Sequence, residues 1–160
     1  MKVGDMQDLK YPECIQRLYE SEVNGEAIWS ALLKAATSER DRYLFATLLQ
    51  LETETKAWLQ PFLYKYRIEL SKPDISPFIE QSVATYQSDR LKALQFGQQV
   101  TARALAEFEA IAAVGPQADQ PYLQGMVRHE SAILAWIEGE IADAGDSAIE
   151  PVIALLRHPI

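Results

Sequence analysis

The chain has 160 residues, of which 48% are hydrophobic and 24% charged, and its formal net charge is -8 at pH 7. This length and composition are typical of one globular domain with a sizeable core. The acidic balance argues against nucleic acid as a partner, because phosphate binding needs clustered Lys and Arg. The single cysteine, Cys14, excludes an internal disulfide and a Cys-x-x-Cys site.

No stretch of the sequence is typical of a targeting or membrane-spanning segment. The first residues, MKVGDMQDLKYPE, lack the apolar run of a signal peptide. No later stretch approaches the roughly 20 apolar residues of a transmembrane helix. We therefore expect a cytoplasmic protein without a membrane partner.

In chain order, helical periodicity predicts four long helices and one short one, at approximately residues 12–36, 39–67, 77–114, 120–143 and 148–156. Ser38 followed by Asp41 is typical of a helix N-cap, and Pro61 predicts a kink in the second helix or a break just before it. Pro73 lies in the longest connection, between the second and third helices. The sequence therefore predicts an all-α four-helix bundle in a single domain, residues 1–160, with a longer crossover in the middle.

Some acidic residues lie at positions where the helical periodicity predicts an apolar, inward-facing side chain. Glu52 follows Leu48 and Leu49 by four and three residues, and Glu22 and Glu130 stand in similar surroundings on the first and fourth helices. A buried carboxylate must be protonated, paired with a cation or bound to a metal, because burying an isolated charge costs several kcal/mol. The three acids on facing helices indicate a shared site, unless they lie at the bundle edge and reach water.

The spacing between acidic and aromatic residues repeats along the chain. Glu52 precedes Trp58 by six residues as Glu130 precedes Trp136, and Glu22 precedes Trp29 by seven as Asp89 precedes Phe96. The repeat indicates two duplicated helical hairpins, with one acid on each helix at equivalent depth. Asp89 and Arg90 compete for the inward position on the third helix, and the pattern leaves that choice open.

Three segments, YESEVNGEAIW, LLQLETETKAWL and MVRHESAILAWI, resemble the metal-site helices of the ferritin-like superfamily, in particular of its rubrerythrin-type members. The resemblance covers about Tyr11 to Asp143 and implies a ferritin-like up-down bundle. In that family, one Glu from each of the first and third helices and a Glu-x-x-His from each of the second and fourth bind two metal ions. Carried across, the metal ligands would be Glu22, Glu52, Asp89 and Glu130.

The chain departs from the family at both histidine positions, which hold Thr55 and Ile133. Four carboxylates could still bind Mn²⁺, Mg²⁺ or Ca²⁺ through oxygen alone. His129 precedes Glu130 by one residue, about 100° around the helix, and is therefore expected to point away from the site. His158, near the C-terminus, is expected to be solvated. The resemblance thus implies iron or manganese at reduced occupancy, or no metal.

Three functions are compatible with this altered site. The first is a ferritin-like protein with a degenerate di-metal site, weakly metal-binding or metal-free, in a structural, regulatory or ligand-binding role. The second is a rubrerythrin-like oxidoreductase or iron-handling enzyme whose carboxylate-only or mononuclear site activates oxygen or peroxide. The third is a helical interaction module in which the inward acids pair with Arg90, Lys56 or a partner's basic residue. A homodimer is the expected assembly, and the sequence identifies neither a redox partner nor a substrate.

Overall fold

The protein is described by a computed structural model that covers residues 10–70 and 74–157. The described residues form α1 (Tyr11–Ala35), α2 (Glu39–Tyr66), α3 (Ser76–Ser88), α4 (Arg90–Val114), α5 (Gln120–Ile141) and α6 (Glu150–Ile153), with 3-10 helices at Gln117–Asp119 and Gly145–Ile149. These residues contain no strand, so the prediction of an all-α fold is confirmed for them.

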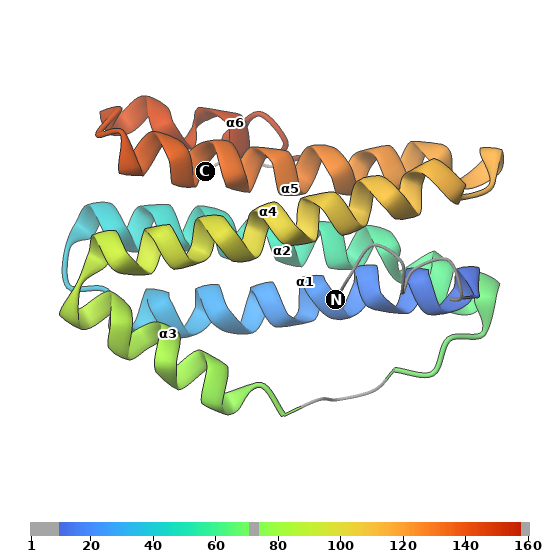
Figure 1. The fold of residues 1–160 in the computed structure, drawn as a ribbon, viewed down its shortest axis with the longest axis horizontal. Helices are drawn as coiled ribbons and strands as arrows, with labels where there is room; N and C mark the ends of the chain where they lie inside the picture. Colours follow the sequence, from blue (N-terminus) through green and yellow to red (C-terminus); the bar gives the residue numbers. More distant parts are fainter. Residues whose placement is uncertain (1–9, 71–73, 158–160) are drawn as a thin grey trace.

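The four long helices form two antiparallel hairpins (Figure 1). Helices α1 and α2 make one hairpin, and α4 and α5 make the other. Helix α3 crosses obliquely and packs against both α1 and α4, whereas within the described residues the backbones of α1 and α4 seldom come close to each other. Arg17 of α1 nevertheless forms an ion pair with Glu107 of α4. The last 3-10 helix and α6 pack on α5. Because α3 lies beside α1 and α4, it covers the side of the bundle where these two helices are apart.

Two helix boundaries follow local chemistry. The side chain of Ser38 accepts a hydrogen bond from the backbone N–H of Asp41, which caps α2 as their spacing indicates. Helix α2 then runs through Pro61 to Tyr66, so the alternative of a break before Pro61 is wrong. Its end is at Arg67, whose backbone is left-handed with φ of 51°.

The helix expected over residues 77–114 is two helices, α3 and α4, separated at Asp89. Asp89 has an extended backbone, and its side chain accepts a hydrogen bond from the backbone N–H of Lys92. Aspartate favours this N-cap position over a helix interior because its short side chain competes for backbone N–H groups. The chain therefore changes direction at Asp89, which turns α3 away from the axis of α4.

The apolar core formed by residues 10–70 and 74–157 consists of two clusters with a polar layer between them. One cluster contains Leu48 and Trp136 and extends to the C-terminal segment. The other contains Ile111 and Met126. Buried polar residues separate the two clusters along the bundle, namely Glu22, Glu52, Thr55, His129 and Glu130. None of the described helices is both long and apolar enough to cross a membrane.

Candidate metal centre

Three side chains from three helices converge in the polar layer. Glu22 on α1, Glu52 on α2 and His129 on α5 each offer one donor atom, and these atoms lie within 4.8 Å of one another. Nε2 of His129 lies 3.4 Å from Oε2 of Glu22 and 3.5 Å from Oε2 of Glu52. All three are buried, with exposed fractions of 1% for Glu22, 4% for Glu52 and 2% for His129. They form a Glu/Glu/His group that could bind a metal ion.

Two of the converging atoms lack a hydrogen-bond partner. Among the described residues, Oε2 of Glu22 and Nε2 of His129 are buried with none, although buried polar atoms are normally satisfied. For metal–ligand bonds of about 2.1 Å, neighbouring ligand atoms are about 3.0 Å apart in octahedral and about 3.4 Å apart in tetrahedral coordination. The separations from Nε2 to the two carboxylates are close to the tetrahedral value, so the residues present fit a divalent metal ion.

Neighbouring residues fix the orientation of the donors. Nε1–H of Trp29 donates to Oε1 of Glu52 at 3.0 Å, which leaves Oε2 to face the histidine. The hydroxyl of Thr55 lies 3.1 Å from Nδ1 of His129. When Nδ1–H donates to Thr55, Nε2 presents its lone pair to the space between the acids. Partners of this kind set the tautomer and the ring orientation in metal sites.

The group carries more acidic than basic side chains. Burial, and then the charges of Glu52 and Glu130, raise the pKa of Glu22 well above its usual range. Burial raises the pKa of Glu130 to about 7, with His129 opposing the rise and Glu52 adding to it. Burial lowers the pKa of His129, but the carboxylates of Glu52 and Glu130 outweigh it and leave that pKa raised. Bound protons or a divalent cation would relieve this accumulation of negative charge.

The four acids that the resemblance implies do not all meet. Glu22 and Glu52 are in the converging group. Glu130 is buried beside it and acts on its electrostatics, but it is not one of the three converging donors. Asp89 is exposed at the start of α4, so the structure does not bring it to the cluster. The inward position belongs to Arg90, which donates to Asp41 and Glu140.

His129 does not point away from the site as expected. Helix α5 is buried over an arc wide enough to hold both His129 and Glu130, which are about 100° apart. The signal was present in the sequence, because Met126 and Ile133 flank His129 at three residues before and four after. His158 lies outside the described residues.

The basic residues proposed as partners of the inward acids pair elsewhere. Lys56 forms an ion pair with Glu26 at the partly exposed edge of α1 and α2. Arg90 is bound by Asp41 and Glu140. Neither basic residue neutralises Glu22 or the other acids of the cluster, which weakens the interpretation as an interaction module held by such pairs.

A cavity of about 400 Å³ adjoins the cluster on the side of α3 and α4. Glu52 and Glu130 form part of its wall, and Trp29 and Phe45 contribute aromatic surface. A smaller cavity of about 150 Å³ reaches His129 and its neighbour Thr55.

Comparison with known proteins gives no family assignment. No protein-family model, curated protein or solved structure matches the chain. The fold and the site by themselves describe an all-helical bundle with a buried Glu/Glu/His group that could bind a metal ion.

Proposed function

We propose that this chain is a ferritin-like protein that binds one divalent transition-metal ion, with Glu22, Glu52 and His129 as ligands. The observation that carries the proposal is the approach of Oε2 of Glu22 to Nε2 of His129 at 3.4 Å, both atoms being buried and without a hydrogen-bond partner among the described residues. A metal ion shared with Glu52 would satisfy both atoms at once and offset the charge of the acids. The two antiparallel hairpins of Figure 1 support the ferritin-like assignment.

One ion fits the residues better than two. A di-metal site of the ferritin type takes two Glu-x-x-His pairs and two further acids, but here the two histidine positions hold Thr55 and Ile133. Asp89, the fourth acid, caps α4 at the surface. His129 supplies one nitrogen from a different position on α5, and Thr55 orients its ring. We therefore infer a mononuclear site.

The donor set selects the metal by its chemistry. One imidazole and two carboxylates suit iron, manganese and zinc. The soft thiolate that copper(I) prefers is not close by, because Cys14 is buried in the apolar cluster around Met126. The ferritin-like resemblance favours iron or manganese within this set. Three protein ligands leave coordination positions open, which is typical of catalytic rather than structural sites.

An oxidoreductase or iron-handling role is therefore preferred over a purely structural one. A bound iron or manganese ion would supply one-electron chemistry toward oxygen or peroxide. The chain's residues would hold and shield this ion: Trp29 holds Glu52, and Thr55 holds the ring of His129. The apolar clusters on either side shield the ion along the bundle, whereas the cavity beside Glu52 leaves one side accessible.

The test is metal content by plasma mass spectrometry after growth in medium supplemented with iron and manganese. We expect close to one ion per chain in the wild type and at least about a tenfold loss in Glu22→Gln and in His129→Asn. Glu138→Gln is the matched control, because Glu138 is an exposed acid on the same helix as His129. No metal in the wild type, or equal metal in all four proteins, would contradict the proposal.

The redox role is tested separately on protein loaded anaerobically with Fe²⁺. We expect hydrogen peroxide to oxidise the bound Fe²⁺, followed by absorption, at a rate that differs from that of Fe²⁺ in buffer. Bound Fe²⁺ that does not react with peroxide or oxygen would contradict the oxidoreductase role while leaving the metal site in place.

A further inference from the structure

The cavity of about 400 Å³ lies where α1 and α4 are apart. Protein interiors contain few voids larger than a water molecule, and this volume is within the range of ligand pockets, ~300–1,000 Å³. On α4 the cavity is bordered by small residues at helical spacing, Ala93, Gly97 and Thr101. A bundle helix that packed directly on α1 would carry larger side chains there.

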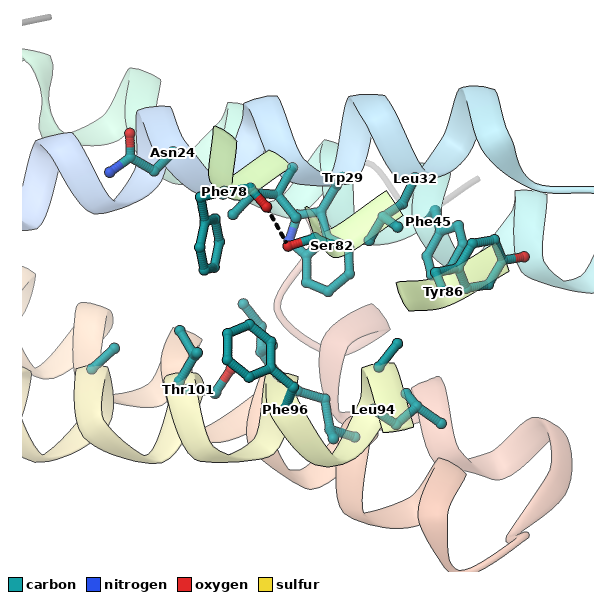
Figure 2. A pocket seen from close by; sticks show the side chains of 18 of the residues that line it. Asn24, Trp29, Leu32, Phe45, Phe78, Ser82, Tyr86, Leu94, Phe96 and Thr101 are labelled. Atoms are coloured by element: carbon teal, nitrogen blue, oxygen red, sulfur yellow. Dashed lines mark hydrogen bonds between the residues drawn. The ribbon is translucent and has the colours of Figure 1, made fainter. Parts of the chain in front are cut away.

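Helix α3 presents part of its apolar side to this space, although Val83 and Tyr86 also pack against the apolar cluster that contains Trp136. None of its residues is buried, and Phe78 and Tyr86 line the cavity. Figure 2 shows Phe78 and Trp29 on one side of the cavity and Phe96 on the other. The helix that closes this part of the bundle therefore forms a wall around an unfilled apolar space.

Two hydroxyls of the wall have hydrogen-bond partners, whereas one buried donor does not. The hydroxyls of Ser82 and Thr85 donate to carbonyls of their own helix, Phe78 O and Gln81 O, at 2.8 Å each. Trp136 also lines the cavity and is fully buried, yet among the described residues its indole Nε1–H has no acceptor. A buried donor without an acceptor is costly. This N–H is itself screened from the cavity, so the surface that the wall offers to a ligand is mainly apolar.

The charges around the cavity disfavour an anion. Glu52 and Glu130 are part of its wall. Arg90 also lines it, but its guanidinium is bound by Asp41 and Glu140. In the described part of the chain, an anionic ligand would therefore meet two acidic side chains and no free guanidinium, and it would lose its hydration.

The cavity is reached from the surface between α3 and α4. Phe96 and Val100 line it and are 41% and 39% exposed. The rings of Phe78 and Phe96 lie 5.8 Å apart across the two helices. A small molecule could enter beside these side chains without unfolding the bundle.

We propose that this cavity binds an uncharged, mainly apolar small molecule. Aromatic and aliphatic side chains line the site, and Glu52 and Glu130 in its wall disfavour an anion. The proposal does not require a metal ion. Where a metal ion is bound as well, the molecule lies against Glu52 and Glu130 and thus beside the site of reaction.

The test uses metal-free protein, so that failure of the metal proposal does not affect it. Prodan, an uncharged naphthyl ketone, is titrated and followed by the blue shift of its emission. We expect saturable binding of one molecule per chain and a loss of at least about tenfold in affinity in Gly97→Leu. A Cβ at Gly97 would meet only Ile137 Cδ1, at 3.6 Å, so the added side chain has room to enter the cavity.

Ala102→Leu is the control for Gly97→Leu, because Ala102 is exposed on the same helix and does not line the cavity. Unchanged prodan binding in a folded Gly97→Leu variant would overturn the proposal, as would an equal loss in Ala102→Leu. Circular dichroism establishes that both variants are folded.

A second measurement uses the native sequence at the cavity and needs no variant there. Phenylnaphthylamine and its sulfonated form, anilinonaphthalene sulfonate, differ in charge on one scaffold. We expect the uncharged compound to bind at least about ten times more tightly and to quench Trp29 and Trp136 in a Trp58→Phe background, since Trp58 does not line this cavity. Tighter binding of the sulfonate, or no quenching, would overturn the proposal.

Discussion

A Cβ atom on Gly25 would overlap the carboxyl group of Glu52. The side chain of Glu52 therefore lies directly against the backbone of α1, in space that only glycine leaves open. Glycine inside a helix costs about 0.5–1 kcal/mol relative to alanine. At Gly25 this loss in helix stability leaves the space that the carboxyl group of Glu52, a predicted metal ligand, occupies.

Gly25→Ala should displace the carboxylate of Glu52 and weaken metal binding by about 10- to 100-fold, the range typical of residues that position ligands. Titration with Mn²⁺ measures the effect. Gly97→Ala is the matched control: its new Cβ would make only an ordinary contact at 3.6 Å, so it should bind metal normally and gain about 0.5–1 kcal/mol in stability. Normal metal affinity in Gly25→Ala would contradict the predicted dependence of metal binding on this placement of Glu52.

Thr55→Val should weaken metal binding by about tenfold, because the ring of His129 loses the partner of its Nδ1. Thr47→Val is the control, since Thr47 is also buried on α2 but its hydroxyl donates to Tyr43 O of the same helix. The metal affinities of the two variants are compared by calorimetry. Equal affinities would indicate that Thr55 has no role in orienting the histidine.

The stability of the bundle should depend on Asp119 in a pH range set by its pKa. Burial raises the pKa of Asp119, but hydrogen bonds from Lys65, Tyr66 and Tyr11 outweigh burial and lower it below 3.8. Because the pKa of Asp119 is lower in the folded than in the unfolded protein, its carboxylate stabilises the fold at pH values above the unfolded-state pKa. This stabilisation is lost as the pH falls through the folded-state pKa. The contribution of Asp119 to the free energy of unfolding is therefore complete near neutral pH and disappears below about pH 4.

Asp119→Asn should thus lower the free energy of unfolding at pH 7 by about 1–3 kcal/mol, and the difference from wild type should shrink below about pH 4. Urea unfolding at a series of pH values measures it. Asp143→Asn, at an exposed position, should change little at any pH. A difference for Asp119→Asn that is constant with pH would contradict the assigned ion pair and hydrogen bonds.

Arg90 joins α4 to two neighbouring helices by donating to Asp41 on α2 and Glu140 on α5. Arg90→Met should lower the free energy of unfolding by about 1–3 kcal/mol, less than for a fully buried pair because the arginine side chain is 35% exposed. Thermal unfolding is the measurement, with Arg42→Met, an exposed position on α2, as the control. Equal stability of the two variants would indicate that these ion pairs are screened by solvent.

The all-α fold was predictable because the helical periodicity of the apolar residues and the helix-capping residues indicate the same helices along most of the chain. The separation of α3 from α4 was not, because periodicity continues across Asp89 and a single residue decides between a helix interior and a cap. The angle of α3 and the cavity beneath it depend on packing against α1 and α4, which a pattern along one helix does not encode.

Part of the candidate site could also be read from the sequence. Glu22 and Glu52 interrupt apolar stripes, and the structure brings them together. His129 was missed because the family pattern directs attention to the residues three positions beyond each glutamate, where Thr55 stands instead. The role of Thr55 as the hydrogen-bond partner of His129 arises between helices α2 and α5 and could not be seen in either segment alone.

The stoichiometry of Mn²⁺ binding tests the mononuclear site most directly, with free Mn²⁺ counted by electron paramagnetic resonance and thermal stability recorded in parallel. We expect one ion per chain, a rise in unfolding free energy of about 2.7 kcal/mol at a hundredfold excess over the dissociation constant, and loss of both in His129→Asn. Two ions per chain, or binding unchanged by His129→Asn, would contradict a mononuclear Glu22, Glu52 and His129 site.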